Sequence, residues 1–463
     1  MPSLLPGETA TIREISTTAG YSTAVKLQQL QPPTAAVPPP CPYVDACGGC
    51  HLQHVSYPHQ LALKHTLVVD ALQRIANIKD AAHLVAPVVP SAAQLAYRNN
   101  MQFVWDPAQS ALGLRPPGSN TETVALHACL LQPVPANTLL QACARLLRAN
   151  PVASAAVERV TIRSAAPSDP NKLCFVVGFS TRVGGEGVRA SLDECAQALR
   201  RQPLGGGVLQ GVVWTLEQDG AGERRRHRVC VLHYYCNVCV FHHTTCPFRV
   251  QERPQQQQHR STTVLYGSSL LHESRVGGPQ MEIAFASFFQ VNAPQANALF
   301  ATVRRLAALQ SDDTVLDLFC GAGAIGLSLA AHVAHVLGID ADGAAIQAAK
   351  DSAHCGRVDN ATFYVADLTT IGDVLKSSQP VDVVIVDPPR AGLHARLVQW
   401  LCTSPAAANA RCVVYVSCNP ATLARDLGRM GKRWRVQAVV PVDMFPQTAH
   451  VEVVALLVPV VAL

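Results

Sequence analysis

Residues 315–324 read Val315-Leu-Asp-Leu-Phe-Cys-Gly-Ala-Gly-Ala324, a short apolar run that leads into a glycine-rich turn. Further apolar runs of strand length follow, and enough chain for a helix separates each run from the next. These runs are Val336–Asp340, Thr362–Val365, Val383–Val386 and Cys412–Val416. Strands and helices that alternate in this way predict an α/β domain built on a doubly wound parallel sheet. Ligands of such sheets bind at the carboxyl ends of the strands.

The residues at the ends of the first three runs indicate a nucleotide-containing ligand. Gly321 and Gly323 allow the backbone to turn tightly and to approach a ligand. Asp340 ends the second run, where a carboxylate can accept both ribose hydroxyls, and Asp367 follows the third run, near an adenine amine. NAD-binding proteins carry similar turns, and an ordinary strand-to-helix turn is a further alternative. Acidic residues at all three ends, without a third glycine for a pyrophosphate, favour S-adenosylmethionine.

A cysteine and a glutamate near the end of the chain indicate the chemistry. Cys418 follows the fifth run in Ser417-Cys-Asn-Pro420, and Glu452 lies 34 residues further on. Methylation of a pyrimidine at C5 needs a nucleophile that adds to C6 and a base that later removes the C5 proton. A thiol and a carboxylate supply these two functions. A buried inert cysteine and a surface glutamate are the alternatives.

The corner Asp387-Pro-Pro-Arg390 follows the fourth run, on the same rim as Cys418. In amino-methyltransferases a similar corner holds an exocyclic amine, and an aromatic residue is favoured after it. Arg390 stands in that place here, which weakens an amine as the acceptor. A free thiol has a pKa of about 8.5 and needs help to ionise at neutral pH. We expect Arg390 to be the cation that favours the thiolate.

Size and composition predict several domains. The chain has 463 residues, and its formal charge of +5 permits nucleic-acid binding without requiring it. No secretory signal is visible, and no apolar run reaches the roughly 18 residues of a membrane-spanning helix. We expect a cysteine-rich segment and a helix in 32–93, a β-rich central domain in 94–283 with an insertion near 216–262, and the doubly wound domain in 284–463.

Six short motifs lie within about residues 41–130 and 265–463. They are Cys41-x5-Cys47-Gly-Gly-Cys50, Phe288-Phe-Gln-Val-Asn292, Asp317-Leu-Phe-Cys-Gly321, Asp387-Pro-Pro-Arg390, Ser417-Cys-Asn-Pro420 and Met444-Phe-Pro-Gln-Thr-Ala-His-Val-Glu452. Together they resemble the motifs of the RNA uracil-C5 methyltransferases, which make 5-methyluridine in transfer and ribosomal RNA. The resemblance implies a Rossmann-like methyltransferase domain that uses S-adenosylmethionine to methylate uridine in structured RNA.

The resemblance also implies roles for single residues. Cys418 matches the nucleophile, Glu452 the proton acceptor, and Phe288 a residue that stacks on the flipped uracil. Arg390 is expected to contact the substrate. Ala324 replaces a residue that is often polar, and Asp340 is shorter than the usual Glu, which weakens cofactor affinity without removing the chemistry. The residues expected to bind the cofactor are Gln290, Phe319, Ala324, Asp340, Asp367 and Asp387.

Two groups of cysteines suggest metal binding, because disulfides are not expected in a protein without a secretory signal. Cys41, Cys47 and Cys50 lie within ten residues, and Cys129 falls where the family has a distant fourth ligand. This grouping favours a [4Fe-4S] cluster over zinc, which more often uses two Cys-x2-Cys pairs. For the second group we favour a strand with loosely placed cysteines over a metal site; it comprises Cys230, Cys236, Cys239 and Cys246, with His242 and His243.

The remaining expectations concern the N-terminus, the target and the location. Residues 1–31 resemble only the tail of the RNA-binding barrel called TRAM, so we expect a remnant of that barrel or a disordered segment. Ribosomal RNA is favoured over tRNA, because relatives with the cluster more often modify ribosomal RNA. We expect a monomer without membrane contact in the cytoplasm, with an organelle as the alternative. The rival functions are RNA cytosine-C5 methylation and a catalytically silent RNA-binding factor.

Overall fold

Two compact units make up the protein in this computed structural model. The doubly wound unit combines Gln60–Asn99, Ser164–Cys174 and Leu270–Leu463, and the central unit combines Met1–His59, Asn100–Arg163 and Phe175–Ser269. The predicted domain boundaries, which follow sequence order, stay a prediction. The structure describes residues 8–17, 22–31, 35–167, 169, 172–218, 259–274, 276–370 and 381–460.

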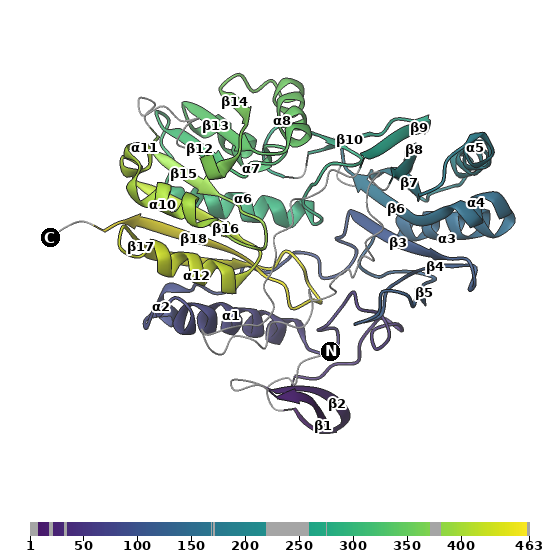
Figure 1. Cartoon of the computed structure of the whole chain (residues 1–463), viewed down its shortest axis with the longest axis horizontal. Coiled ribbons are helices and arrows are strands. Elements are labelled where there is room, and N and C mark those ends of the chain that lie inside the picture. Colours follow the sequence, from purple (N-terminus) through teal and green to yellow (C-terminus); the bar gives the residue numbers. More distant parts are fainter. Residues whose placement is uncertain are drawn as a thin grey trace. The chain divides into compact units, whose positions relative to one another are not determined.

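A seven-stranded mixed sheet forms the centre of the doubly wound unit (Figure 1). Its order is β14-β13-β12-β15-β16-β18-β17; the first five strands pair in parallel, and β18 runs antiparallel to both of its neighbours. The predicted α/β fold with a doubly wound sheet is confirmed. The strands are β12 (Thr314–Leu318), β13 (His335–Asp340), β14 (Ala361–Val365), β15 (Val383–Val386), β16 (Cys412–Ser417), β17 (Trp434–Val442) and β18 (Glu452–Pro459).

Helices connect these strands, and polar side chains mark where several of them begin. The side chains of Asn292, Asp342 and Asn419 each accept a hydrogen bond from a backbone N–H at a helix start. Such caps satisfy N–H groups that have no partner within the helix. The helices are α6 (Ala293–Ala307), α7 (Ala324–Leu329), α8 (Gly343–Cys355), α10 (Ala395–Thr403), α11 (Pro405–Ala408) and α12 (Pro420–Met430). A short antiparallel pair, β10 (Leu270–Glu273) and β11 (Met281–Ala284), completes the elements before α6.

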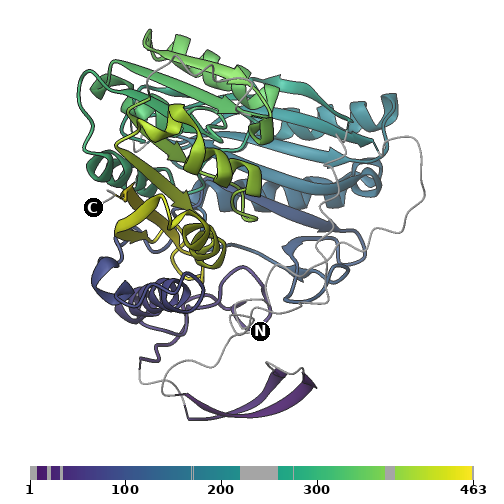
Figure 2. The ribbon, with the colours of Figure 1, turned by 60° about the vertical axis from the view of Figure 1, so that its left-hand side comes forward.

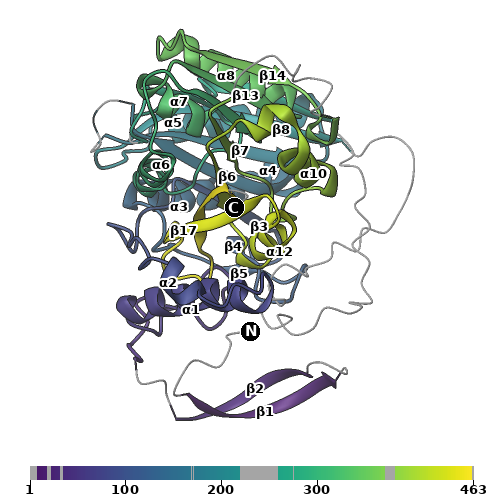
Figure 3. The same ribbon diagram turned by 90° about the vertical axis from the view of Figure 1, so that its left-hand side faces the viewer.

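A segment from the N-terminal part of the chain packs on the same sheet. Figures 2 and 3 show α1 and α2 beside the hairpin of β17 and β18. Val68 and Leu72 of α1 belong to the same buried core as Trp434. Val89 forms a parallel bridge with Val442, at the end of β17. The two helices span Tyr57–Arg74 and Ala81–Leu84. A helix expected within 32–93 is therefore observed, and its apolar face belongs to the core of the doubly wound unit.

The central unit contains a second seven-stranded sheet in the order β5-β4-β3-β6-β7-β8-β9. Its strands are β3 (Asn100–Asp106), β4 (Ala111–Leu114), β5 (Val124–Ala125), β6 (Val157–Ala165), β7 (Cys174–Thr181), β8 (Val208–Gln218) and β9 (His259–Gly267). The β-rich prediction did not include its helices, which are α3 (Val134–Ala149), α4 (Pro151–Ala156) and α5 (Glu186–Arg200). The indole N–H of Trp105 in β3 donates to the Ser154 carbonyl of α4 at 3.0 Å, which fixes α4 to the sheet.

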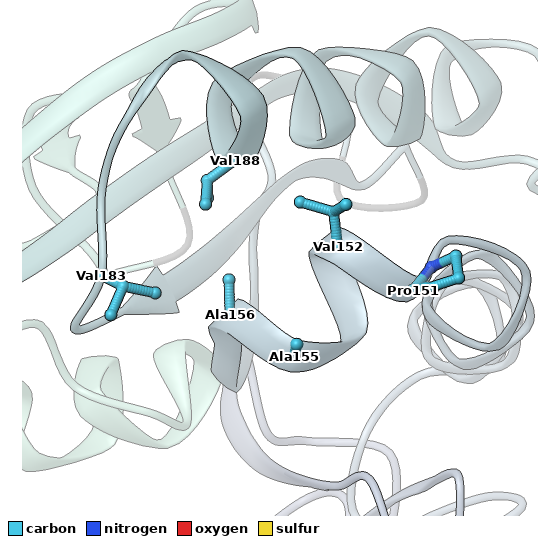
Figure 4. A pocket seen from close by; sticks show the side chains of 6 residues that line it. All are labelled: Pro151, Val152, Ala155, Ala156, Val183 and Val188. Carbon is cyan, nitrogen blue, oxygen red and sulfur yellow. The ribbon is translucent and has the colours of Figure 1, made fainter.

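Two further features of the central unit offer no chemistry. β1 (Thr9–Thr17) and β2 (Ser22–Gln31) form an antiparallel hairpin (Figure 3), and its relation to a TRAM barrel stays a prediction. A hollow of about 400 Å³ is lined by apolar side chains alone (Figure 4), so it cannot transfer a proton; they are Pro151, Val152, Ala155, Ala156, Val183 and Val188. Among the helices described, none has the length and hydropathy needed to cross a membrane.

Candidate active site

Strands β16 and β18 bring Cys418 and Glu452 to one edge of the sheet. Their antiparallel register pairs Ser417 with Val453 as its last rung. Cys418 directly follows Ser417, and Glu452 directly precedes Val453, so both residues lie beside this last rung. Residues directly opposite each other in antiparallel strands have Cβ atoms about 4.5–5.5 Å apart. The hairpin of β17 and β18 therefore returns a carboxyl group to the thiol across 34 residues of sequence.

Hydrogen bonds fix the turn that carries Cys418. The Ser417 hydroxyl accepts from the backbone N–H of Asn419 at 3.1 Å. The Asn419 amide group donates to the Arg390 carbonyl at 3.3 Å, and the Thr422 hydroxyl donates to the same carbonyl at 3.2 Å. These bonds connect the turn to the corner that begins at Asp387. Cys418 itself is half-buried, so its sulfur is not sealed within the apolar core.

A buried carboxylate secures the chain just after Arg390. Asp426 of α12 accepts from the Tyr415 hydroxyl at 2.9 Å and from the Leu393 backbone N–H at 2.7 Å. Gly392 has φ +76°, and a Cβ there would lie 2.4 Å from a carboxylate oxygen of Asp426. Only glycine fits this close approach without displacing the carboxylate. The loop that presents Arg390 is consequently fixed at both ends.

Four side chains at this edge, those of Asp387, Arg390, Cys418 and Glu452, lie close enough to interact electrostatically. Burial and, to a smaller extent, Asp387 raise the pKa of Glu452, and Arg390 opposes them, which leaves it at about 8. Burial also raises the pKa of Cys418 to about 11, with Glu452 and Asp387 adding to the rise and Arg390 opposing it. Arg390 thus acts in the predicted direction, but burial and the carboxylates outweigh it. The role of Arg390 as the cation that favours the thiolate stays a prediction.

Asp317 is an acidic residue that sequence reasoning quoted in a motif but did not assign to the site. It is fully buried in β12, and its Oδ2 accepts from the Gly326 backbone N–H at 3.0 Å. Its Oδ1 has no hydrogen-bond partner among the residues that the structure describes. Burial, followed by Asp387 and Asp340, raises the pKa of Asp317 to about 8. A carboxylate inside an apolar strand was the available signal, because burying one without a purpose is costly.

The turn after β12 leaves room for a ligand. Asp340 accepts from the backbone N–H groups of Gly321 and Asp342, both at 2.9 Å. Phe319, Gly321 and Gly323 all have positive φ values, of 62°, 54° and 77°. A Cβ on Gly321 would meet nothing within 4 Å, so this part of the turn faces open space. Carboxyl groups of Asp317, Asp340 and Asp387 near that space suit a positively charged nucleoside such as S-adenosylmethionine.

Other predicted cofactor and substrate residues occupy different positions on this unit. Ala324 begins α7, and Asp367 accepts from the Thr369 backbone N–H at 2.8 Å, which lowers the pKa of that carboxyl. The Gln290 carbonyl accepts from the Asn99 side chain at 2.9 Å. Phe288 is 78% exposed while its neighbour Phe289 is buried. The ring of Phe288 is thus available to a flat ligand from solvent.

The N-terminal cysteines lie close enough to influence one another. Burial raises the pKa of Cys50 to about 12, and Cys129, Cys47 and Cys41 each contribute to the rise. The Gly49 backbone N–H donates to the Cys47 sulfur at 3.4 Å, and the Cys129 backbone N–H donates to Asn137 at 2.8 Å. Within the described part of the chain, however, no three or more His, Cys, Asp or Glu side chains are arranged to hold a metal ion. The predicted cluster is therefore not confirmed. The second group, Cys230, Cys236, Cys239 and Cys246 with His242 and His243, lies outside the described residues.

The doubly wound sheet and its acidic carboxyl edge define an α/β enzyme of the methyltransferase class. A family model described as tRNA (Uracil-5-)-methyltransferase matches residues 271–459. An RNA methyltransferase of Nitratidesulfovibrio vulgaris is 30% identical, over 98% of this chain and 89% of its own length. One of Thermosynechococcus vestitus is 32% identical, over 98% and 91%. A solved structure, Pyrococcus abyssi tRNA (uracil-54, C5)-methyltransferase in complex with S-adenosyl-L-homocysteine, has a TM-score of 0.65 at 23% identity and covers 98% of this chain and 94% of its own.

The chain belongs to the same family as these two relatives and is an RNA methyltransferase. The likeness to the Pyrococcus abyssi structure shows the shared fold over both units.

Proposed function

We propose that this protein methylates C5 of a uridine in structured RNA, with Cys418 as nucleophile and Glu452 as base. The observation that carries the proposal is the last rung of β16 and β18, Ser417 with Val453, which brings a half-buried thiol and a buried carboxyl close enough to interact electrostatically at the carboxyl edge of the sheet. The nucleophile and the base would therefore act on the same substrate base. An inert core cysteine would have no need of this arrangement.

The reaction proceeds by addition and elimination. The Cys418 thiolate forms a bond to C6 of uracil, and the electron pair of the C5–C6 double bond moves toward the C4 carbonyl, which makes C5 nucleophilic. S-adenosylmethionine, when bound, supplies the electrophilic methyl group that C5 captures. Glu452 then removes the C5 proton, the double bond re-forms and Cys418 leaves as thiolate. Asp317, Asp340, Asp387, Gln290 and Phe319 would hold the cofactor, with Ala324 and Asp367 at its rim.

The charges at the site match this sequence of events. The carboxyl groups that raise the pKa of Cys418 would be neutralised in part by a cationic cofactor, which favours the thiolate only when a methyl donor is present. A raised pKa also suits Glu452, because a base must be strong enough to take a carbon-bound proton at neutral pH. Arg390 adds a positive charge close to both groups. It is proposed to contact the substrate.

A base must leave its stack before it can reach Cys418. Flipping costs a few kcal/mol in a duplex and less in an RNA loop, whose bases are partly unstacked. The exposed ring of Phe288 is suited to stack on the extruded uracil. We propose ribosomal RNA as the target. The name of the matching family model favours tRNA as the second candidate. Mapping 5-methyluridine in both RNA pools, with and without this protein, distinguishes them.

We also propose that Cys41, Cys47, Cys50 and Cys129 hold a [4Fe-4S] cluster that joins the N-terminal segment to the central unit. Their mutual influence on the pKa of Cys50 supports a shared site. Cluster ligands are thiolates, so a bound iron centre would reverse the raised pKa values of these thiols. Iron and sulfide analysis of anaerobically purified protein tests this directly. About four atoms of each per chain are expected, and stoichiometric zinc would contradict the proposal.

Incubation with an RNA loop and labelled cofactor tests the function. We expect label in 5-methyluridine and none after Cys418→Ala substitution. Methylcytidine as the only product would identify a cytosine-C5 enzyme instead. Full biological rescue by the Cys418→Ala variant would identify an RNA-binding role without catalysis.

A further inference from the structure

The loop of residues 443–451, here called the base loop, joins β17 to β18. Its two ends meet in the last rung of the hairpin, where Val442 pairs with Glu452. Any shift of the base loop therefore displaces the backbone that carries the proposed base. Side chains from distant parts of the sequence hold this loop residue by residue, and all of them belong to the doubly wound unit.

A buried lysine holds the first part of the base loop. The Lys64 ammonium group of α1 lies 2.5 Å from the Asp443 carboxylate and donates to the Phe445 carbonyl at 3.1 Å. Between these two residues, the Met444 carbonyl accepts from the Asn292 side chain at 3.2 Å. Three successive residues of the loop are thus fixed by polar bonds to α1 and to the start of α6.

Two neutral side chains hold the next residues. The Tyr97 hydroxyl donates to the Pro446 carbonyl at 3.0 Å. Gln60 of α1 makes two bonds to Gln447, donating to its side-chain oxygen at 2.9 Å and accepting from its backbone N–H at 3.1 Å. Gln447 has φ +70°, a conformation that is unfavourable for a residue with a Cβ. The two hydrogen bonds to Gln60 offset part of that conformational cost.

Burial makes these bonds decisive. Lys64 and Asp443 are both fully buried, and Gln60, Tyr97 and Gln447 are at most 6% exposed. Water cannot take the place of a lost partner at such positions, so each bond enforces one loop conformation. Burial lowers the pKa of Lys64 and the Asp443 carboxylate opposes this, which ties the charged lysine to its partner. Loops on the surface differ in this respect, because water can replace a lost hydrogen-bond partner there.

We propose that Lys64, Tyr97 and Gln60 are positioning residues for proton removal, because they hold the base loop so that Glu452 faces C5 of the substrate. The inference rests on the proposed role of Glu452. Cys418 is held separately, by Ser417 and by the link from Asn419 to Arg390. Disturbing the base loop should therefore slow resolution of the methylated adduct and leave addition and methyl transfer nearly unchanged. A purely structural role would reduce all steps equally, in proportion to the folded fraction.

Single-turnover reactions with a uridine-containing RNA loop and labelled S-adenosylmethionine test this separation. Samples quenched in denaturant give the methylated covalent adduct and the released methylated RNA as separate bands. For Lys64→Met we expect adduct resolution to slow about 10-fold or more, since small misplacements of a catalytic group are costly. Tyr97→Phe removes one hydroxyl with little risk to folding, and we expect about 3-fold slower resolution.

Two controls separate the explanations. Arg411→Met breaks an ion pair with Asp313 at the opposite edge of the same sheet, so it lowers stability without accumulation of adduct. Glu452→Gln must accumulate adduct if the proposed base is right; if it does not, the proposed function and this inference both fail. If Glu452→Gln traps adduct while Lys64→Met and Tyr97→Phe resolve it at the wild-type rate, only the positioning role is overturned. If Arg411→Met and Lys64→Met slowed adduct resolution equally, the positioning role would likewise be overturned.

Discussion

The two edges of the doubly wound sheet differ in how their charges are balanced. At the amino edge, Arg411 pairs with Asp313 through two bonds, one of them 2.7 Å long, and Asp382 accepts from the Thr314 backbone N–H at 2.8 Å. At the carboxyl edge, burial raises the pKa values of Asp317, Asp387 and Glu452 to about 8, 7 and 8. At Glu452, the positive charge of Arg390 opposes the rise in pKa.

The contrast indicates that one edge stabilises the fold and the other serves chemistry. Buried acids with raised pKa values reduce the stability of a protein unless a ligand compensates for them, and such groups gather at functional sites. The paired charges of the amino edge have no such cost. We therefore expect substitutions at the carboxyl edge to change activity, and comparable substitutions at the amino edge to change stability alone.

The largest expected effect on activity appears when two cysteines are compared, one at the start of β16 and one directly after its end. Cys418→Ala should reduce methyl transfer by about 10⁴-fold or more, because no other group forms the bond to C6. Cys412→Ala, at the other end of β16, should cost about 1 kcal/mol of stability and leave the rate per folded molecule unchanged. Rates with labelled cofactor, corrected by the folded fraction from circular dichroism, provide the comparison. Equal rates for the two variants would contradict the assignment of Cys418.

The next effect concerns the base. Glu452→Gln should slow turnover by about 10²–10⁴-fold, since the amide cannot accept the C5 proton. Methyl transfer itself should persist, so that a methylated RNA–protein adduct accumulates with time. A denaturing gel with labelled cofactor measures the adduct, and the wild-type enzyme shows its steady-state level. Loss of both turnover and adduct would mean that Glu452 acts before methyl transfer and not after it.

A smaller effect, of opposite sign, concerns stability and pH. The pKa of Glu452 rises from 4.5 to about 8 on folding. The folded state therefore binds more protons than the unfolded state between these values, and wild-type stability falls as the pH rises through this window. Glu452→Gln removes this dependence. Its melting temperature should match wild type near pH 4.5 and exceed it by about 2–4 °C at pH 8 or above. A constant difference across this range would contradict the raised pKa.

The smallest effect on activity is expected at the amino edge. Arg411→Met leaves the buried Asp313 without its cation, which should cost about 1–3 kcal/mol of stability. The rate of methyl transfer per folded molecule should equal that of wild type. Chemical denaturation and initial rates measure the two quantities. A selective loss of rate in this variant would show that the two edges are not independent.

The sequence predicted the strands and the edge at which they converge, because apolar runs and turn residues are local signals. The expected sites for Cys418, Glu452, Asp387 and Arg390 also depended on local motifs, and these side chains interact electrostatically in the structure. Local signals cannot reveal partners far apart in the chain. Lys64 and Asp443 are 379 residues apart, and nothing in the periodicity of α1 marks a lysine that is buried.

Two other failures have different physical causes. The helices of the central unit were missed because short strands with alternating residues dominate its sequence, while α3 and α5 begin without an N-cap side-chain bond. The raised pKa of Cys418 could not be predicted from the sequence, because a pKa depends on burial and on all nearby charges, which a single neighbouring arginine does not reveal. Cys41, Cys47, Cys50 and Cys129 lie in irregular segments beside turns, where no periodic pattern predicts their arrangement.

Mass spectrometry of the Glu452→Gln variant tests the central claim most directly. The variant is incubated with uridine-containing RNA and S-adenosylmethionine, then denatured and digested with protease and nuclease. We expect a peptide that contains Cys418, with 5-methyluridine attached through the sulfur of this cysteine. Recovery of that peptide without any nucleotide, while 5-methyluridine still forms in the RNA, would contradict it.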